Sequence, residues 1–170
     1  AAVGELIPEI LGVSDVQKVL QHLLRERIPI RDMVTIIETL ADFAPKTKDV
    51  EQLGEIVRSA ISRTITRQYL DPENKLCCLT LDPALERKLA DKVNVTSMGN
   101  ALVLDSILQA ELVQSLKSEY ERATMMGHQP VLLCGSQVRL PIRRFLDRHL
   151  PNLAVLAYSE ISSKADVEFV

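Results

Sequence analysis

Three short runs of almost wholly apolar residues lie in the second half of the chain, over 75–81, 131–134 and 153–158. Turn-forming residues bound each run, and each is too short for a helix, which favours strands covered on both faces. Such strands are typical of parallel sheets, whose crossover connections are usually helices. We therefore predict an α/β arrangement here, with a further strand over 166–170.

Helix start and stop signals separate these apolar runs. Aspartate or serine before an apolar periodic stretch predicts an N-cap, proline suits the first turn, and glycine ends a helix. The predicted elements are a helix capped by Asp82 that ends near Lys92, a loop over 94–100, a helix from Asp105 or Ser106 to Gly127, and a helix with Pro141 at its first position.

The first half of the chain has helical periodicity, with apolar residues recurring every three or four positions. Polar start signals precede each stretch and prolines or polar turns follow it. The predicted helices begin at a Ser14–Gln17 capping box, near Arg31 and at Asp49, and end before Pro29, near Pro45 and near Tyr69.

The change of pattern predicts an α+β or α/β chain of two subdomains. Residues 1–74 are expected to form a three- to four-helix subdomain, for which a winged-helix-like topology is open. Residues 75–170 are expected to form a small α/β sandwich with a mostly parallel sheet of three or four strands. The chain begins with Ala1 rather than Met, so we expect it to be a piece of a longer protein.

Charge and hydropathy exclude several classes of partner. The chain has 20 Lys and Arg against 23 Asp and Glu, a net charge of −3 and a pI of about 5.7. Nucleic acids and anionic membranes require a basic surface, so neither is expected to bind this chain. It has no apolar run of about 18 residues, the length needed to cross a bilayer, and the composition of its first residues leads us to expect no signal peptide.

The cysteines and histidines predict neither a disulfide framework nor a metal site. An odd cysteine count with one adjacent pair is not a framework, and a zinc site needs about four convergent ligands. We expect reduced cysteines, no metal and no cofactor. The residues concerned are Cys77, Cys78 and Cys134, with His22, His128 and His149.

Sequence motifs allow two binding hypotheses to be compared, DNA binding by the first half and phosphate or nucleotide binding by the second. A DNA-recognition helix over 31–43 would carry one arginine against Asp32, Glu38 and Asp42, so it would turn an acidic face toward phosphates. The loop after Cys134 resembles a phosphate-binding turn, but it has one glycine and no G-x-G-x-x-G pattern. A small α/β enzyme or nucleotide-binding module using this loop is our alternative hypothesis, although no catalytic acid, base or nucleophile is identified.

Arginines gather on two predicted helices. Clustered arginine is typical of protein interfaces, whereas the plainer interpretation is a solvated helix face. We take both groups as candidate protein-interface residues. They are Arg139, Arg143, Arg144 and Arg148 on one helix, and Arg58, Arg63 and Arg67 on the other.

Two longer stretches resemble the FHIPEP family, the large inner-membrane export-gate proteins of bacterial flagella and injectisomes. The first is VQKVLQHLLRERIPIRDMVTIIETLADFAP, from Val16 to Pro45. The second runs from Pro130 onward and includes PVLLC, Arg139, Leu150-Pro151-Asn152-Leu153 and Glu160-Ile161. The resemblance covers most of the chain and is weakest over 91–105. The phrase around Pro29 to Pro45 is closer to the flagellar branch.

The resemblance implies a noncatalytic platform. Family members have an N-terminal membrane part and a cytoplasmic part of four subdomains that assembles into a nine-fold ring. This part receives export substrates and their chaperones. The chain resembles the last two subdomains, on the cytoplasmic face of the bacterial inner membrane. Expected partners are export-apparatus proteins, export substrates, chaperones and further copies of the protein. No chaperone-docking residue carries over to this chain.

Overall fold

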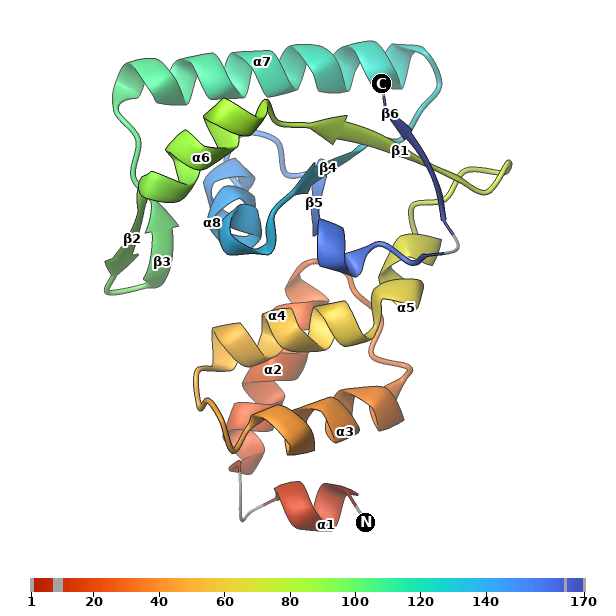
Figure 1. Cartoon of the computed structure of the whole chain (residues 1–170), viewed down its shortest axis with the longest axis vertical. Helices are drawn as coiled ribbons and strands as arrows, with labels where there is room; N and C mark the ends of the chain where they lie inside the picture. The colour runs from red at the N-terminus through yellow and green to blue at the C-terminus, as the bar shows by residue number, and fades with distance from the viewer. Residues whose placement is uncertain (1, 8–10, 164, 170) are drawn as a thin grey trace. The chain divides into compact units, whose positions relative to one another are not determined.

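The computed structural model describes residues 2–7, 11–163 and 165–169 and divides the chain into two compact units. Unit 1 is Ala1–Gln68 and unit 2 is Tyr69–Val170. The division lies before the predicted boundary at Asn74. The turn at 71–74 belongs to unit 2, because the backbone N–H of Asp71 donates to the carbonyl of Lys75 at the start of the sheet. Figure 1 shows the order of the elements along the chain.

Unit 1 is helical over the part that the structure describes. Its core is formed by leucine, isoleucine and valine side chains, among which Leu40, Leu53 and Ile65 are fully buried. The predicted three helices are therefore confirmed in outline. The helices are α1 (Ala2–Leu6), α2 (Val13–Arg25), α3 (Met33–Phe43), α4 (Val50–Ala60) and α5 (Ser62–Arg67).

Two details of unit 1 differ from the prediction. The predicted capping box is wrong, because α2 begins at Val13 after Gly12 and Ser14 lies inside its first turn. The third predicted helix is two helices, because Ile61 leaves the helical conformation between α4 and α5. The helix start at Asp49 is confirmed, and α3 begins after an N-cap at Asp32, next to the start predicted near Arg31. Both aspartates accept a backbone N–H of the first turn.

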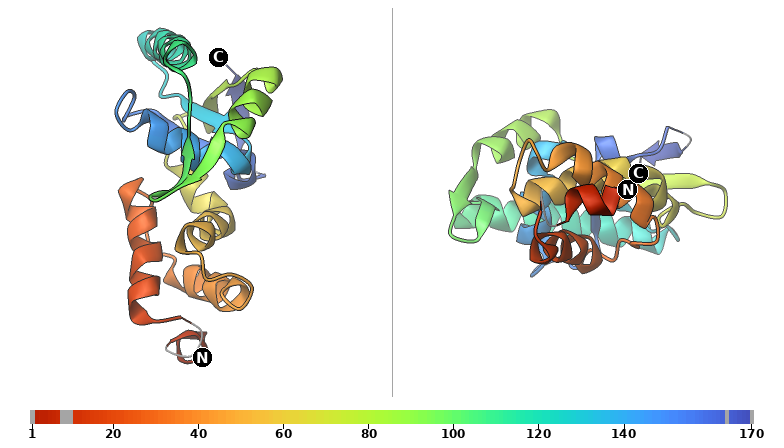
Figure 2. Two further views of the ribbon diagram at one scale, coloured as in Figure 1. Left: turned by 90° about the vertical axis from the view of Figure 1, so that its left-hand side faces the viewer. Right: turned by 90° about the horizontal axis from the view of Figure 1, so that it is seen from below.

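Unit 2 contains a four-stranded parallel sheet in the order β5-β4-β1-β6 and a separate antiparallel hairpin, β2–β3. Helices α6, α7 and α8 all contribute side chains to one core with β1, β4 and β5. The left view of Figure 2 looks along α7. The elements are β1 (Lys75–Thr80), α6 (Pro83–Asp91), β2 (Val93–Thr96), β3 (Gly99–Leu102), α7 (Ser106–Met125), β4 (Val131–Cys134), α8 (Ser136–Leu146), β5 (Ala154–Ala157), a 3-10 turn (Tyr158–Glu160) and β6 (Asp166–Phe169).

The predicted strands, including the fourth, and the cap at Asp82 are confirmed. Gly127, with φ of 86°, ends α7 as expected, because its left-handed backbone lets the following N–H groups bond back to the last turn. The predicted loop over 94–100 is wrong. It forms the β2–β3 hairpin, in which Val93 and Val95 alternate with polar residues and Gly99, with φ of 98°, closes the turn.

The predicted start of the last helix is also wrong. α8 begins at Ser136, directly after β4, and Pro141 lies inside it. Val138, before the proline, and Ile142, after it, both pack into the core of unit 2. Burial of this apolar face compensates for the one helical hydrogen bond that proline cannot donate.

Candidate functional site

Arg139 and Arg143 of α8 are buried and bind backbone carbonyls in the edge strand β5 and just before it. The Arg139 Nη1 donates to the carbonyl of Val155 at 3.0 Å, and Arg143 donates to the carbonyl of Leu153. Carbonyls two residues apart point to the same side of a strand. Four residues of a helix span about 6 Å and two residues of a strand span about 6.6 Å. The spacing of the two arginines along α8 therefore equals the spacing of the two carbonyls that they bind.

These contacts cover the outer side of β5. Glu160, which is 1% exposed, lies 3.8 Å from the Nε of Arg139 and accepts the N–H of Ala157. Arg143 also donates to the carbonyl of Leu150. The prediction that Arg139 and Arg143 lie on an exposed interface is therefore wrong, because an edge strand needs partners for its open carbonyls and these side chains provide them.

The other predicted arginines divide between internal contacts and the surface. Arg58 is 1% exposed and its Nη1 lies 3.6 Å from Glu26 Oε1, so it too is internal and not an exposed interface residue. Arg144 is half-buried and donates to the carbonyl of Asn100, which ties the β2–β3 hairpin to α8. The exposed members of the two groups are Arg63, Arg67 and Arg148.

The loop after Cys134 already holds a carboxylate. The backbone N–H of Gly135 donates to Glu86 Oε1 at 2.6 Å. In a phosphate-binding turn this N–H would donate to the ligand. Here the carboxylate of Glu86 occupies the position of the phosphate, and its negative charge would repel an anion. The geometry therefore disfavours the alternative hypothesis of a nucleotide site at this loop.

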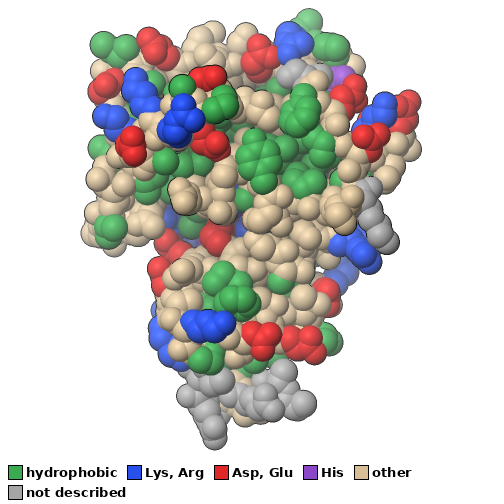
Figure 3. Space-filling view, viewed as in Figure 1, with side chains coloured by type: hydrophobic (Ala, Val, Ile, Leu, Met, Phe, Trp, Pro, Cys, Tyr) green, Lys and Arg blue, Asp and Glu red, His purple; other side chains and the backbone are tan. Residues whose placement is uncertain are grey.

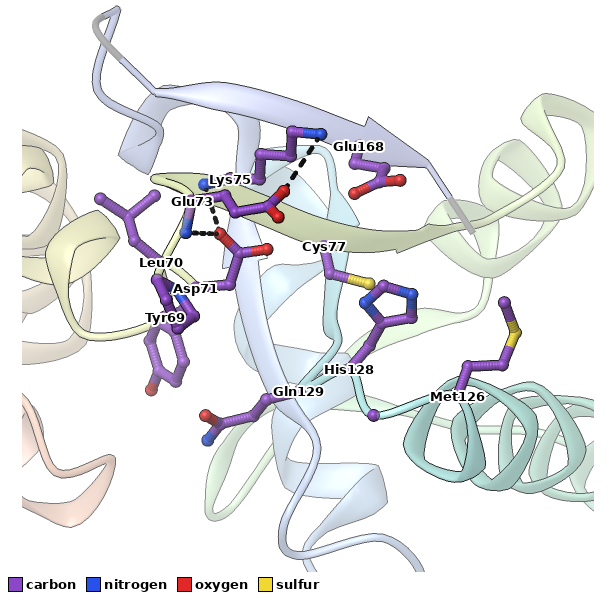
Figure 4. Close-up of a pocket in the computed structure, with 12 residues that line it drawn as sticks. Tyr69, Leu70, Asp71, Glu73, Lys75, Cys77, Met126, His128, Gln129 and Glu168 are labelled. Atoms are coloured by element: carbon purple, nitrogen blue, oxygen red, sulfur yellow. Dashed lines mark hydrogen bonds and ion pairs between the residues drawn. The ribbon is translucent and has the colours of Figure 1, made fainter.

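An acidic pocket of about 520 Å³ lies at the amino end of β1 (Figure 4). The turn at 69–73 forms one wall, the segment 126–129 after α7 forms another, and β1 and β6 form the base. Figure 3 shows acidic side chains at the right margin of unit 2, with hydrophobic side chains reaching the surface on the same face. The labelled residues are Tyr69, Leu70, Asp71, Glu73, Lys75, Cys77, Met126, His128, Gln129 and Glu168.

The carboxylates of this pocket have different surroundings. One oxygen of Asp71 accepts the backbone N–H groups of Glu73 and Lys75, each at 2.8 Å, so it holds the turn in place. Glu73 lies 3.6 Å from the ammonium of Lys75. Glu168 comes from β6, where it is paired in register with Cys77 of β1. The pocket thus has three carboxylates and one lysine, and it favours a cationic ligand group.

The cysteine in the pocket is not a reactive thiolate. Burial raises the pKa of the Cys77 thiol, and the nearby carboxylates of Glu168 and Asp71 raise it further. A thiol nucleophile needs a lowered pKa and a cationic neighbour. Among the residues that the structure describes, no group of three or more His, Cys, Asp or Glu side chains is arranged to hold a metal ion. The raised pKa keeps the Cys77 thiol protonated at neutral pH.

Sequence reasoning missed this pocket. Local pattern predicts only a helix end near Tyr69 and a subdomain boundary after Asn74 in this region, and it places Glu168 on the last predicted strand. The signal was the concentration of carboxylates in the turn just before a buried strand. Glu168 joins them only because β6 pairs with β1 and places it beside Cys77, which local pattern does not reveal.

The fold defines a chain of two units, one helical and one built around a parallel sheet. The FHIPEP family model matches residues 1–166, and the chain belongs to the FHIPEP family. This is a structural and transport family of export-gate proteins, which confirms the expectation of a chain that is not an enzyme. No helix in the described part of the chain has the length and apolar character to cross a membrane.

Curated relatives are similar over nearly the whole chain. The flagellar biosynthesis protein FlhA of Bacillus subtilis is 36% identical over 168 residues, which cover 99% of this chain and 25% of that protein. FlhA of Proteus mirabilis is 40% identical over 157 residues, 92% of this chain and 22% of that protein. The low calcium response locus protein D of Yersinia pestis is 30% identical over 168 residues, which cover 97% of this chain and 24% of that protein. The chain thus spans about a quarter of these relatives' length.

Solved structures have the same fold. The cryo-EM structure of nonameric EPEC SctV-C is similar with a TM-score of 0.87 and 27% identity, over 99% of this chain and 50% of that chain. The Chlamydia pneumoniae CdsV in its complex with CdsO has a TM-score of 0.80 and 25% identity, over 99% of this chain and 49% of that one. Both units of this chain therefore have counterparts in these proteins.

Proposed function

We propose that the chain is a noncatalytic platform segment of a type III protein-export gate, which takes part in ring assembly and docks other export components. The observation that carries this proposal is the similarity of the whole chain to one protomer of a nonameric assembly, with a TM-score of 0.87. Its place would be the cytoplasmic face of the bacterial inner membrane. The two subdomains would be the helical part, predicted over 1–74, and the α/β part over 75–170.

A flagellar rather than a virulence system is favoured by the relatives. The flagellar proteins FlhA are 36% and 40% identical to this chain, whereas the low calcium response protein D is 30% identical. The chemistry of the acidic pocket favours a partner with lysine or arginine side chains. We propose export-apparatus proteins, export substrates and their chaperones as the class of partner, together with further copies of the protein.

The exposed arginines are further candidate docking residues, two of them in unit 1 and one in unit 2. Three arginine side chains are exposed and could bind an acidic protein surface. They are Arg63 and Arg67 on α5 and Arg148 after α8. In the parent protein, Arg148→Glu is expected to reduce secretion of export substrates without changing the melting temperature. The matched control is Lys117→Glu, the same charge change on the exposed side of α7. Normal secretion by a folded Arg148→Glu protein would contradict a role for this arginine.

Ring assembly has its own test. The cytoplasmic part of the parent protein is expected to sediment as a ring-sized oligomer, and removal of the segment corresponding to this chain is expected to reduce it to smaller species. Secretion should be lost at the same time. If the shortened protein still assembles and secretes normally, the platform proposal is wrong for this segment.

A further inference from the structure

The four-stranded sheet of unit 2 has two edges, and they differ. At one edge, the carbonyls of Val155 in β5 and of Leu153 just before it already accept hydrogen bonds from Arg139 and Arg143. At the other edge, β6 pairs in parallel with β1 and, within the described residues, with no other strand (Figure 1). An edge strand without a cover offers a row of backbone donors and acceptors. Strand addition to this sheet is therefore possible at β6 and blocked at β5.

The side chains of β6 give the open edge two chemically different faces. Asp166 and Glu168 alternate with Val167 and Phe169, so the acidic pair lies on one face of the sheet and the apolar pair on the other. Glu168 lines the acidic pocket, so the acidic face of β6 continues into it. On the apolar face, Phe169 is 66% exposed. A strand added beside β6 would therefore meet carboxylates on one face and apolar groups on the other.

The charge of this edge decides what can occupy it. A second copy of β6 in antiparallel pairing would place carboxylates opposite carboxylates or, one residue out of that register, opposite Val167 and Phe169. Like charges directly opposite each other are destabilising, and an apolar side chain gives a carboxylate no partner. A basic side chain in the same position would pair with Asp166 or Glu168 and point toward the pocket. On the apolar face, a β-branched or aromatic side chain of the added strand would pack favourably against Phe169. The complementary sequence is one in which basic and apolar residues alternate.

We propose that the β6 edge binds an extended segment of another export-apparatus protein, in which lysine or arginine alternates with apolar residues, and that this segment adds to the sheet as a fifth strand. Its backbone pairs with β6, and its basic side chains enter the acidic pocket from the side of Glu168. Main-chain hydrogen bonds provide the affinity in this mode of recognition, and the alternating side chains provide the specificity. The proposal rests on the proposed docking function, for which it specifies the site and the form of the partner.

A synthetic peptide in which lysine and valine alternate, labelled with fluorescein, is the probe. Fluorescence anisotropy of the peptide with the purified chain is expected to show saturable binding. A peptide with glutamate in place of lysine should bind at least about tenfold more weakly, because like charges then meet across the edge. Equal binding of the two peptides would overturn the charge complementarity.

A second probe separates strand addition from simple charge attraction. Methylation of alternate backbone nitrogens removes hydrogen-bond donors from the lysine–valine peptide and keeps its charge. The methylated peptide is expected to lose at least about tenfold in affinity, because one edge of its backbone can no longer pair. If it binds as tightly as the parent peptide, the strand-addition proposal is wrong. Hydrogen exchange at the amides of 166–169 should slow when the parent peptide binds, and unchanged exchange there would also refute it.

Variants of the chain locate the binding site. Glu168→Lys is expected to weaken binding of the lysine–valine peptide at least about tenfold, whereas Glu121→Lys, the same change on the exposed face of α7, should leave it unchanged. Asp166→Lys, at an exposed position, serves if the Glu168 variant does not fold. Equal effects at positions 168 and 121 would overturn the site. These measurements involve neither ring assembly nor secretion. A negative result would therefore refute strand addition without contradicting the platform proposal, which is tested separately.

Discussion

The imidazole ring of His22 on α2 lies directly against the backbone of Gly54 on α4, and a β-carbon at position 54 would be 2.4 Å from Cδ2 of the ring. The ring is 7% exposed, and its Nε2 is 2.9 Å from Glu55 Oε2 on the same helix α4. The absence of a side chain at Gly54 therefore allows the close approach of α2 and α4 in unit 1.

We expect Gly54→Ala to lower the free energy of unfolding by about 1–3 kcal/mol, because the new methyl group overpacks against the buried ring. The measurement is a urea denaturation curve. The matched control is Gly4→Ala on α1, where a β-carbon meets nothing within 4 Å. There the same change should be neutral or stabilising by up to about 1 kcal/mol, as for alanine in a helix.

A double variant checks that the ring is the cause. His22→Ala removes the side chain that the new methyl group would strike, so Gly54→Ala should cost much less in its presence. The expected coupling between the two positions is about 0.5–3 kcal/mol. Strictly additive effects would show that the strain at position 54 has another origin.

The buried arginines of α8 should matter for stability rather than for surface charge. Arg143→Met removes the donors to the carbonyls of Leu150 and Leu153 and leaves those groups without their partner. We expect a loss of about 2–5 kcal/mol in the free energy of unfolding, since buried polar groups without partners are costly. Arg148→Met, at an exposed position after the same helix, should change it by less than about 0.5 kcal/mol. A neutral Arg143→Met would mean that β5 does not depend on this cover.

The apolar face of α3 gives a direct test of the helical unit. Leu40 is fully buried and Val34, on the same helix, is 68% exposed. Leu40→Ala is expected to destabilise the chain by about 2–5 kcal/mol through lost burial and a cavity. Val34→Ala should be nearly neutral in the same thermal or urea melts. Similar costs at both positions would show that the buried face of α3 is misplaced.

The buried thiols should make the chain less stable in alkali. Burial raises the pKa of the Cys78 thiol from 9.0 to about 12, with Cys77 as a smaller cause. The unfolded thiol ionises near pH 9 and the folded one does not, so the unfolded state loses its proton first. The stabilising contribution is therefore complete below about pH 9 and is lost as the pH rises toward about 12.

Urea melts between pH 7 and pH 10 measure this effect. The free energy of unfolding of the wild-type chain is expected to fall with pH above about 9, and that of Cys78→Val to fall less steeply. Valine is close in size and cannot ionise, so other alkaline titrations are common to both proteins. Parallel curves would refute the assignment to Cys78.

The sequence by itself determined the parts of this protein that depend on local pattern. Short apolar runs are buried strands because nothing but a two-sided core accommodates them. The helix starts at Asp49, Asp82 and Asp105 follow from side chains that bond the first turn of their own helix. The stretch from Val16 to Pro45 also contained enough specific positions to indicate the FHIPEP family.

Tertiary structure alone decided which charges are available. Arg143 and Arg148 look alike in sequence, but Arg143 is buried and bonds the carbonyls of Leu150 and Leu153 before β5, whereas Arg148 is exposed. The difference depends on what packs beside α8. Glu168 became part of a pocket only through the register of β6 on β1. Register and packing arise from contacts between residues far apart in sequence, which no local pattern encodes.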